Sequence, residues 1–175
     1  ALLSKIMLSS GGGIVNEILL NLHLISKPLD FLVSLNMAMP SVIGINVWIG
    51  IPFNMILLTT GLSNIPDSYY EAAAVDGANA FVRFFRITLP LMKASMLSVV
   101  ILGVIYTFKV FDLVFVSTGG GPVDATELMS TYAYRLSFSQ YSFSKGAAVA
   151  NILFLMLFAV GLIYIRLVGK DEVME

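Results

Sequence analysis

The chain has 175 residues, of which 58% are hydrophobic and only 12% are charged, whereas an ordinary soluble domain carries about 25% charged residues. The 10 basic and 11 acidic residues give a net charge of -1, so the chain lacks the basic surface that nucleic-acid binding requires. Cysteine is absent and there is one histidine, which excludes disulfides, cysteine nucleophiles and the usual zinc sites. We therefore expect an all-α protein whose solvent is membrane lipid, with no cofactor.

No complete membrane span is predicted within the first 39 residues. Residues 1–8 are short and apolar, and we interpret them as the tail of an earlier span. No initiator methionine or signal peptide is visible, so we expect earlier spans to be missing from this sequence. Residues 14–25 are apolar apart from Glu17 and His23, and are long enough for an interfacial helix.

A first membrane span is predicted over residues 40–62. No charged side chain occurs between Asp30 and Asp67, and a helix needs roughly 20 apolar residues to cross the bilayer. Asn46 and Asn54 lie inside this span, and a buried amide costs free energy unless it is paired. Both amides should therefore face protein or water, either for hydrogen bonding between helices or for contact with a solute.

Two further spans are predicted over residues 94–116 and 146–165, which makes three spans, or four if the N-terminal tail is counted. The first of them follows Pro90, whose missing N–H is harmless in the first turn of a helix. Lys109 and Asp112 lie near its far end, where two residues three apart on a helix can pair with each other and reach water. They are also the candidate relay if the protein is an ion-coupled secondary transporter.

Orientation follows from the basic residues, because short cytoplasmic loops carry an excess of Lys and Arg. Arg83, Arg86 and Lys93 lie between the first and second spans, and Arg166 and Lys170 follow the third. Three crossings place both groups on one side of the membrane. The loop after residue 62 and the C-terminus are therefore predicted to be cytoplasmic, and residues 11–39 and 117–145 to be outside.

The second outer segment begins with a turn-forming run, Gly119 to Pro122. After it, Leu128, Tyr132 and Leu136 recur at four-residue spacing. This spacing predicts a helix over residues 126–136 that lies on the membrane or across the mouth of the helical bundle.

The cytoplasmic loop, residues 65–90, is predicted to be a helix-turn-helix. Pro66 suits a first helical position, the acidic Asp67 and Glu71 lie near the N-terminal end, and three alanines follow. Gly77 is the natural break between the two helices. The second helix would have an apolar face formed by Phe81, Phe84 and Phe85. Its two arginines, Arg83 and Arg86, would be directed at water or at an acidic partner.

The turn of this loop has a surface suited to a protein groove. Ala72, Ala73, Ala74 and Gly77 have small or no side chains, so that a partner can approach the backbone closely. Glu71 supplies one fixed charge beside them.

The loop resembles that of ABC importer permeases, which has the form Glu-Ala-Ala, three residues, Gly, nine residues, Ile-x-Leu-Pro. The matching positions are Glu71, Ala72, Ala73, Gly77, Ile87, Leu89 and Pro90. Ordinary residue frequencies give a chance match of roughly one in a million for a chain of this length. The resemblance implies that the loop docks into a cleft of a separate ATPase subunit. The residues implied in this coupling are Glu71, Ala72, Ala73, Asp76 and Gly77.

Further residues resemble the carbohydrate-uptake type of permease, which serves maltose, glycerol phosphate and similar solutes. They are Tyr70, the run 75–78, Phe111 and Asp112, the run 118–122, and Thr126. The Phe-Asp and Gly-Gly-Pro features resemble the first of the two unlike permeases of such systems. The resemblance implies a multi-pass protein of the cell membrane that is the C-terminal part of one permease domain, 1–175. The implied partners are an ATPase pair, a second paralogous permease, an extracytoplasmic solute-binding protein, membrane lipid and a sugar-like solute.

The chain is not predicted to be an enzyme. Neither glycine triplet, 11–13 or 119–121, is followed by the Gly-Lys-Ser/Thr of a phosphate-binding loop, so ATP hydrolysis would belong to a partner subunit. Sugar sites use amides, hydroxyls and aromatic faces. The candidates for a solute path are Asn46, Asn54, Tyr106, Thr107 and Asn151. Trp48, the one tryptophan, fits sugar stacking or ordinary packing equally well.

Overall fold

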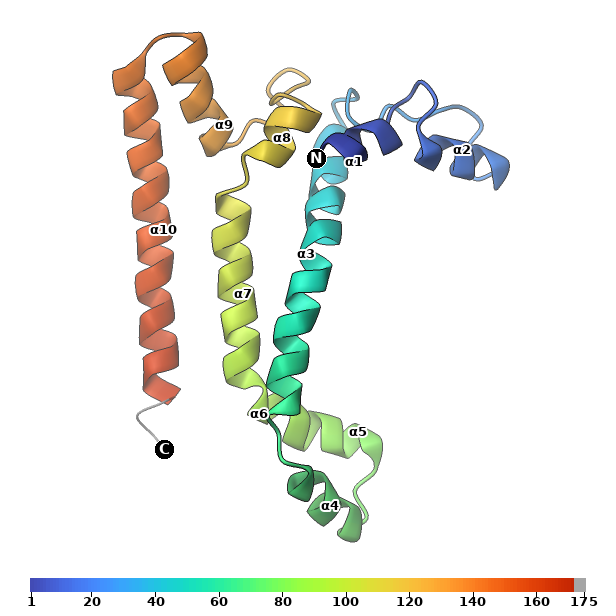
Figure 1. Ribbon diagram of the computed structural model, residues 1–175, viewed down its shortest axis with the longest axis vertical. Helices are drawn as coiled ribbons and strands as arrows, with labels where there is room; N and C mark the ends of the chain where they lie inside the picture. Colours follow the sequence, from blue (N-terminus) through green and yellow to red (C-terminus); the bar gives the residue numbers. More distant parts are fainter. Residues whose placement is uncertain (172–175) are drawn as a thin grey trace. The chain divides into compact units, whose positions relative to one another are not determined.

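The computed structural model describes residues 1–171, and every regular element in that range is a helix (Figure 1). This confirms the all-α expectation. Residues 172–175 of the expected permease domain, and the side chain of Lys170, lie outside the described part. The elements are α1 (Leu2–Met7), α2 (Ile14–Asn21), α3 (Ala38–Ser63), α4 (Asp67–Val75), α5 (Ala80–Arg83), the π-helix η1 (Phe84–Thr88), α6 (Leu89–Leu91), α7 (Lys93–Phe108), α8 (Asp112–Ser117), α9 (Met129–Tyr134), the π-helix η2 (Arg135–Ser139) and α10 (Phe143–Asp171).

The chain forms two compact units. The first consists of residues 1–49 and 106–158, and contains α1, α2, α8, α9 and η2. The second consists of residues 50–105 and the chain from residue 159 onward, and contains the loop from α4 to α6.

Two helices have the length and composition of membrane spans. They are α3, with 26 residues, and the part of α10 from Phe143 to Arg166, with 24 residues. They agree with the spans predicted over 40–62 and 146–165. A third candidate span is the bent pair formed by residues 80–91 and α7.

The single helix predicted over residues 94–116 is wrong. The helix ends at Phe108, and α8 begins separately at Asp112, after Phe111 with φ of -130°. An acidic residue stabilises a helix N-terminus, and the Val110 carbonyl between the helices accepts a hydrogen bond of 2.6 Å from Ser130 Oγ, so the chain can break here without leaving that carbonyl unpaired. Lys109 therefore does not share a helix with Asp112, and the two form no ion pair in the described structure.

A small apolar core holds the first unit together. Val42 and Ile45, one turn apart on α3, pack with Leu113 and Val114 of α8. Residues from the connecting segments pack around them: Leu8, Leu32, Val110 and Leu128. Outside this core most large apolar side chains of α3 and α10 are exposed, which is the arrangement expected of helices that face lipid.

A buried asparagine closes the irregular segment after α2. Asn16 is only 2% exposed, and its Nδ2 donates to the carbonyls of Ser9 and Leu29, at 3.2 and 3.0 Å. The Leu29 N–H donates back to Asn16 Oδ1 at 2.9 Å. One amide thus pairs three main-chain groups that no helix satisfies, which the sequence pattern did not indicate.

We expect Asn16→Ala to destabilise the first unit by about 1–3 kcal/mol, because it leaves the half-buried Leu29 N–H and carbonyl without their partner, whereas the Ser9 carbonyl keeps the bond from the Gly13 N–H. Asn21→Ala is the matched control, because Asn21 ends the same helix but is exposed. Thermal unfolding of both variants in detergent measures the difference. Equal unfolding temperatures for the two variants would show that the Asn16 bonds do not hold this unit.

Candidate functional site

The loop between α3 and α7 is a helical hairpin, with α4 as its first arm and α5, η1 and α6 as its second (Figure 1). The helix-turn-helix prediction is thus confirmed. Pro66, which was expected inside α4, is instead its N-cap, with φ of -63° and an extended ψ of 138°. Its ring fixes φ at the value needed to enter the helix, so Asp67 becomes the first helical residue.

The first arm ends in a Schellman motif. Asp76 is the C-cap, and the next residue, Gly77, has φ of +73°. The Gly77 N–H donates to the Ala74 carbonyl at 3.1 Å, and the Ala78 N–H donates to the Ala73 carbonyl at 2.9 Å. These two bonds are the pair that defines the motif, and they satisfy carbonyls that the end of the helix leaves free.

Glycine is required at position 77 by the backbone conformation, and not by a lack of room for a side chain. No described atom lies within 4 Å of the position where a Cβ would stand. At positive φ a Cβ comes too close to the main chain of its own residue, which costs free energy. Glycine has no Cβ and avoids this cost.

The second arm begins with its own cap. Asn79 Oδ1 accepts a hydrogen bond of 2.9 Å from the Val82 N–H. Arg83 was expected to point at water or at an acidic partner, but it is half-buried, and its Nε donates to the Ala78 carbonyl at 2.9 Å. Arg83 therefore braces the turn, because its guanidinium reaches a carbonyl that the hairpin exposes, while Arg86 stays exposed.

The two arms are joined near their base. Tyr70 of α4 lies 2.9 Å, hydroxyl to hydroxyl, from the buried Thr88 of η1. Next to the hairpin α3 and α7 meet closely, because a Cβ at Gly61 would lie 2.5 Å from Ser95 Oγ. The hairpin is thus tied internally and is continuous with two closely packed helices.

The predicted coupling residues gather on one end of this hairpin. Glu71, Ala72, Asp76 and Gly77 are exposed, and Ala73 is half-buried. Glu71 forms no ion pair with any described residue. The arrangement offers two carboxylates, those of Glu71 and Asp76, beside a bare backbone turn, which suits recognition by a protein groove.

The candidates for a solute path are more dispersed. Asn46, Tyr106, Thr107 and Asn151 belong to the first unit, whereas Asn54 belongs to the second. The two asparagines of α3 are half-buried, and the other three residues are exposed. Within the described chain neither asparagine of α3 has a hydrogen-bonded side-chain partner, so the choice between helix pairing and solute contact stays open.

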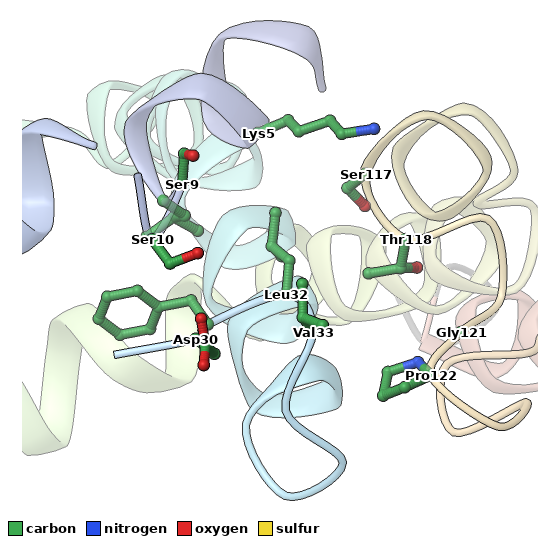
Figure 2. Close-up of a pocket in the computed structure, with 12 residues that line it drawn as sticks. Lys5, Ser9, Ser10, Asp30, Leu32, Val33, Ser117, Thr118, Gly121 and Pro122 are labelled. Carbon is green, nitrogen blue, oxygen red and sulfur yellow. The ribbon is translucent and has the colours of Figure 1, made fainter. Parts of the chain in front are cut away.

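The first unit also contains a cavity of about 330 Å³ that sequence reasoning missed (Figure 2). Lys5 of α1 projects across it toward α8, where its Nζ donates to the Val116 carbonyl at 3.2 Å. The wall is completed by residues of the segments 8–10, 30–33, 117–118 and 121–122. No spacing in the sequence indicated that these segments meet.

The glycine run beside this cavity forms the predicted turn. Gly119 and Gly120 have φ of +64° and +92°. Thr126 is fully buried, and its Oγ1 donates to the Gly121 carbonyl at 2.7 Å and lies 2.6 Å from Thr118 Oγ1. The hydroxyls thus fix both ends of the turn.

An ion-pair network follows the turn. Arg135 binds Asp124 at 2.8 Å and Glu127 at 3.2 Å. The helix predicted over 126–136 begins later, at Met129, because Leu128 is its N-cap with extended backbone, and it continues through η2 to Ser139.

Comparison with known proteins decides the family. Residues 6–169 match the family described as binding-protein-dependent transport system inner membrane component. The chain belongs to this family. It is therefore a component of a membrane transporter, which confirms the resemblance to ABC importer permeases and leaves the ion-coupled alternative without support.

Individual relatives agree with this assignment. A putative ABC transporter permease of Caldicellulosiruptor sp. is 43% identical over 127 residues, which cover 73% of this chain and 91% of that protein. The trehalose/maltose transport permease MalF of Thermococcus litoralis is 34% identical, covering 95% of this chain and 55% of that protein. In a bacterial ABC transporter that imports alginate, one chain matches with a TM-score of 0.83 at 23% identity, over 96% of this chain and 58% of that chain. The chain thus spans little more than half the length of the last two proteins.

The Schellman turn predicts how substitutions at Gly77 will act. We expect Gly77→Val to destabilise the turn by roughly 1–2 kcal/mol. This corresponds to about tenfold faster hydrogen exchange of the main-chain amides at positions 77 and 78. Gly77→Asn is the control, because asparagine tolerates positive φ. Slow exchange in the valine protein would contradict the backbone explanation.

Proposed function

We propose that the chain is part of the permease subunit of an ATP-driven importer, in which it lines the path of a sugar or sugar-like solute. The names of relatives support this class of solute, since they include permeases for trehalose/maltose and for diacetylchitobiose. The proposed partners are a pair of ATPase subunits, a second, paralogous permease and an extracytoplasmic solute-binding protein. A related transporter has been solved with a periplasmic protein that carries an alginate pentasaccharide.

The hairpin is the proposed coupling element, and its geometry is the observation that carries the proposal. Glu71 and the bare turn at Gly77 are exposed for a partner, while Tyr70 and Thr88 tie the two arms together. A displacement imposed at Glu71 is thereby passed to α3 and α7, the helices that precede and follow the hairpin. The ATPase would supply the chemistry, and this chain would supply the mechanical joint.

The proposed orientation places the hairpin and the C-terminus in the cytoplasm. Its support is the three basic residues of the hairpin and the following helix, Arg83, Arg86 and Lys93, because short cytoplasmic loops carry an excess of Lys and Arg. The segment with the glycine run and Arg135 would then face outward. The solute path would be lined from Asn46, Asn54, Tyr106, Thr107 and Asn151.

Reversing the charge at Glu71 tests the coupling role. We expect Glu71→Lys to abolish uptake and to reduce co-purification of the ATPase, while membrane abundance stays within a factor of two of the parent, because an exposed residue contributes only about 0.5 kcal/mol to folding. Asp67→Lys is the control, because it makes the same charge change on the same helix, away from the bare turn. Normal uptake and normal ATPase recovery in the Glu71→Lys protein would sink the coupling proposal.

Single cysteines test the orientation, because this sequence has none of its own. Cysteine at Asp76, which is exposed, should react only with thiol reagent admitted to the cytoplasm. Cysteine at Val123, which is 90% exposed, should react with impermeant reagent added outside. The reverse labelling would overturn the proposed topology.

A further inference from the structure

The two arms of the hairpin expose different chemistry. The first arm and its turn carry the acidic residues Asp67, Glu71 and Asp76, and no basic residue. The second arm, residues 80–91, carries Arg83 and Arg86, and no acidic residue. Its exposed surface is otherwise largely apolar, with exposed large side chains at Phe81, Val82, Phe84, Phe85, Leu89 and Leu91.

Three phenylalanines form one continuous patch on the second arm. The ring centroids of Phe81 and Phe85 are 4.6 Å apart, and those of Phe84 and Phe85 are 5.0 Å apart. All three side chains are about half exposed or more, the most exposed being Phe81 at 73%. A contiguous exposed apolar patch of this kind marks an interaction site.

The direction of the second arm indicates what covers this patch. Residues 80–91 are bent by 64° from α7, with a single residue, Met92, between the two helices. Membrane helices tilt on average about 20° from the bilayer normal. If α7 crosses the bilayer with such a tilt, the second arm lies about 44–84° from the normal, so for most directions of tilt it runs nearer to the membrane plane. An amphipathic segment in that position lies in the interface between headgroups and acyl chains.

We propose that the second arm is a lipid-binding element that lies in the leaflet next to the Lys93 end of α7. The rings of Phe81, Phe84 and Phe85 enter the acyl region, and the exposed Arg86 binds the phosphates of anionic phospholipids. The inference deepens the proposed coupling function and rests on it for the role of the first arm. The acidic arm serves the ATPase, and the basic, aromatic arm holds the hairpin to the bilayer.

Lipid fits the second arm better than a protein groove does. The arm is joined to an apolar candidate span by Met92 alone, so its Leu91 end lies at the membrane surface if α7 crosses the bilayer. The basic residues are complementary to an anionic leaflet. The ATPase, by contrast, is offered the oppositely charged arm.

Spin labels on single cysteines test the proposal in the complete permease, reconstituted in bilayers of phosphatidylethanolamine and phosphatidylglycerol. The labelled variants are Phe84→Cys and, as the matched control, Tyr69→Cys on the first arm, because these side chains are exposed to similar extents, 49% and 52%. Collision with dissolved oxygen reports lipid, and collision with a nickel chelate reports water. We expect the ratio of oxygen to nickel collisions to be several times higher at position 84 than at 69 before any ATPase is added.

A water-like ratio at position 84 in the bilayer overturns the proposal, and so does a ratio that rises only after the ATPase is added, which would assign the patch to a protein. Replacement of phosphatidylglycerol by phosphatidylcholine should lower the ratio at position 84, and Arg86→Gln should remove most of that dependence. Protection of the label at position 69 from the nickel chelate when the ATPase is added tests the coupling role separately. Failure of the lipid-binding proposal is therefore distinguishable from failure of the coupling proposal.

Discussion

The backbone reversal at Gly77 is the constraint on which the hairpin between α3 and α7 depends. Two main-chain hydrogen bonds close α4 there, and they require a left-handed residue at one position. Because the closure uses main-chain atoms alone, the side chains around it are free for other purposes. Glu71 and the alanines can therefore remain exposed without any cost to the integrity of the turn.

The turn of the hairpin and the glycine turn at 119–122 are held by different contacts. At the hairpin, Arg83 braces the turn through a main-chain carbonyl. At the glycine turn, Thr126 is buried and holds the glycine run with its hydroxyl, and Arg135 binds two carboxylates beyond it. The pair between Arg135 and Asp124 is exposed, and exposed ion pairs contribute little to stability in water, so the buried Thr126 hydroxyl is the firmer of these two contacts.

Much of this architecture was predictable from the sequence, because hydrophobic runs and helix signals are local. Three local features predicted helices α3 and α4 and the turn between the arms correctly. They are the uncharged run through α3, the alanines of α4, and Gly77. The break after Phe108 was not predictable, because an apolar run resumes on its far side, and the hydrogen bond that Ser130 Oγ donates to the Val110 carbonyl comes from a distant residue. The Asn16 bonds and the cavity beside Lys5 also depend on distant segments, and no spacing encodes them.

The Asn16 amide also has a consequence for how this protein can vary in length. By joining residues 9, 16 and 29 it closes the intervening chain into a lobe, whose residues 21–24 and 26–28 are exposed. Doubling the length of a flexible loop costs only about 0.6 kcal/mol. The lobe around His23 is accordingly a place where an epitope or a whole small domain can be inserted while the helices on either side keep their register.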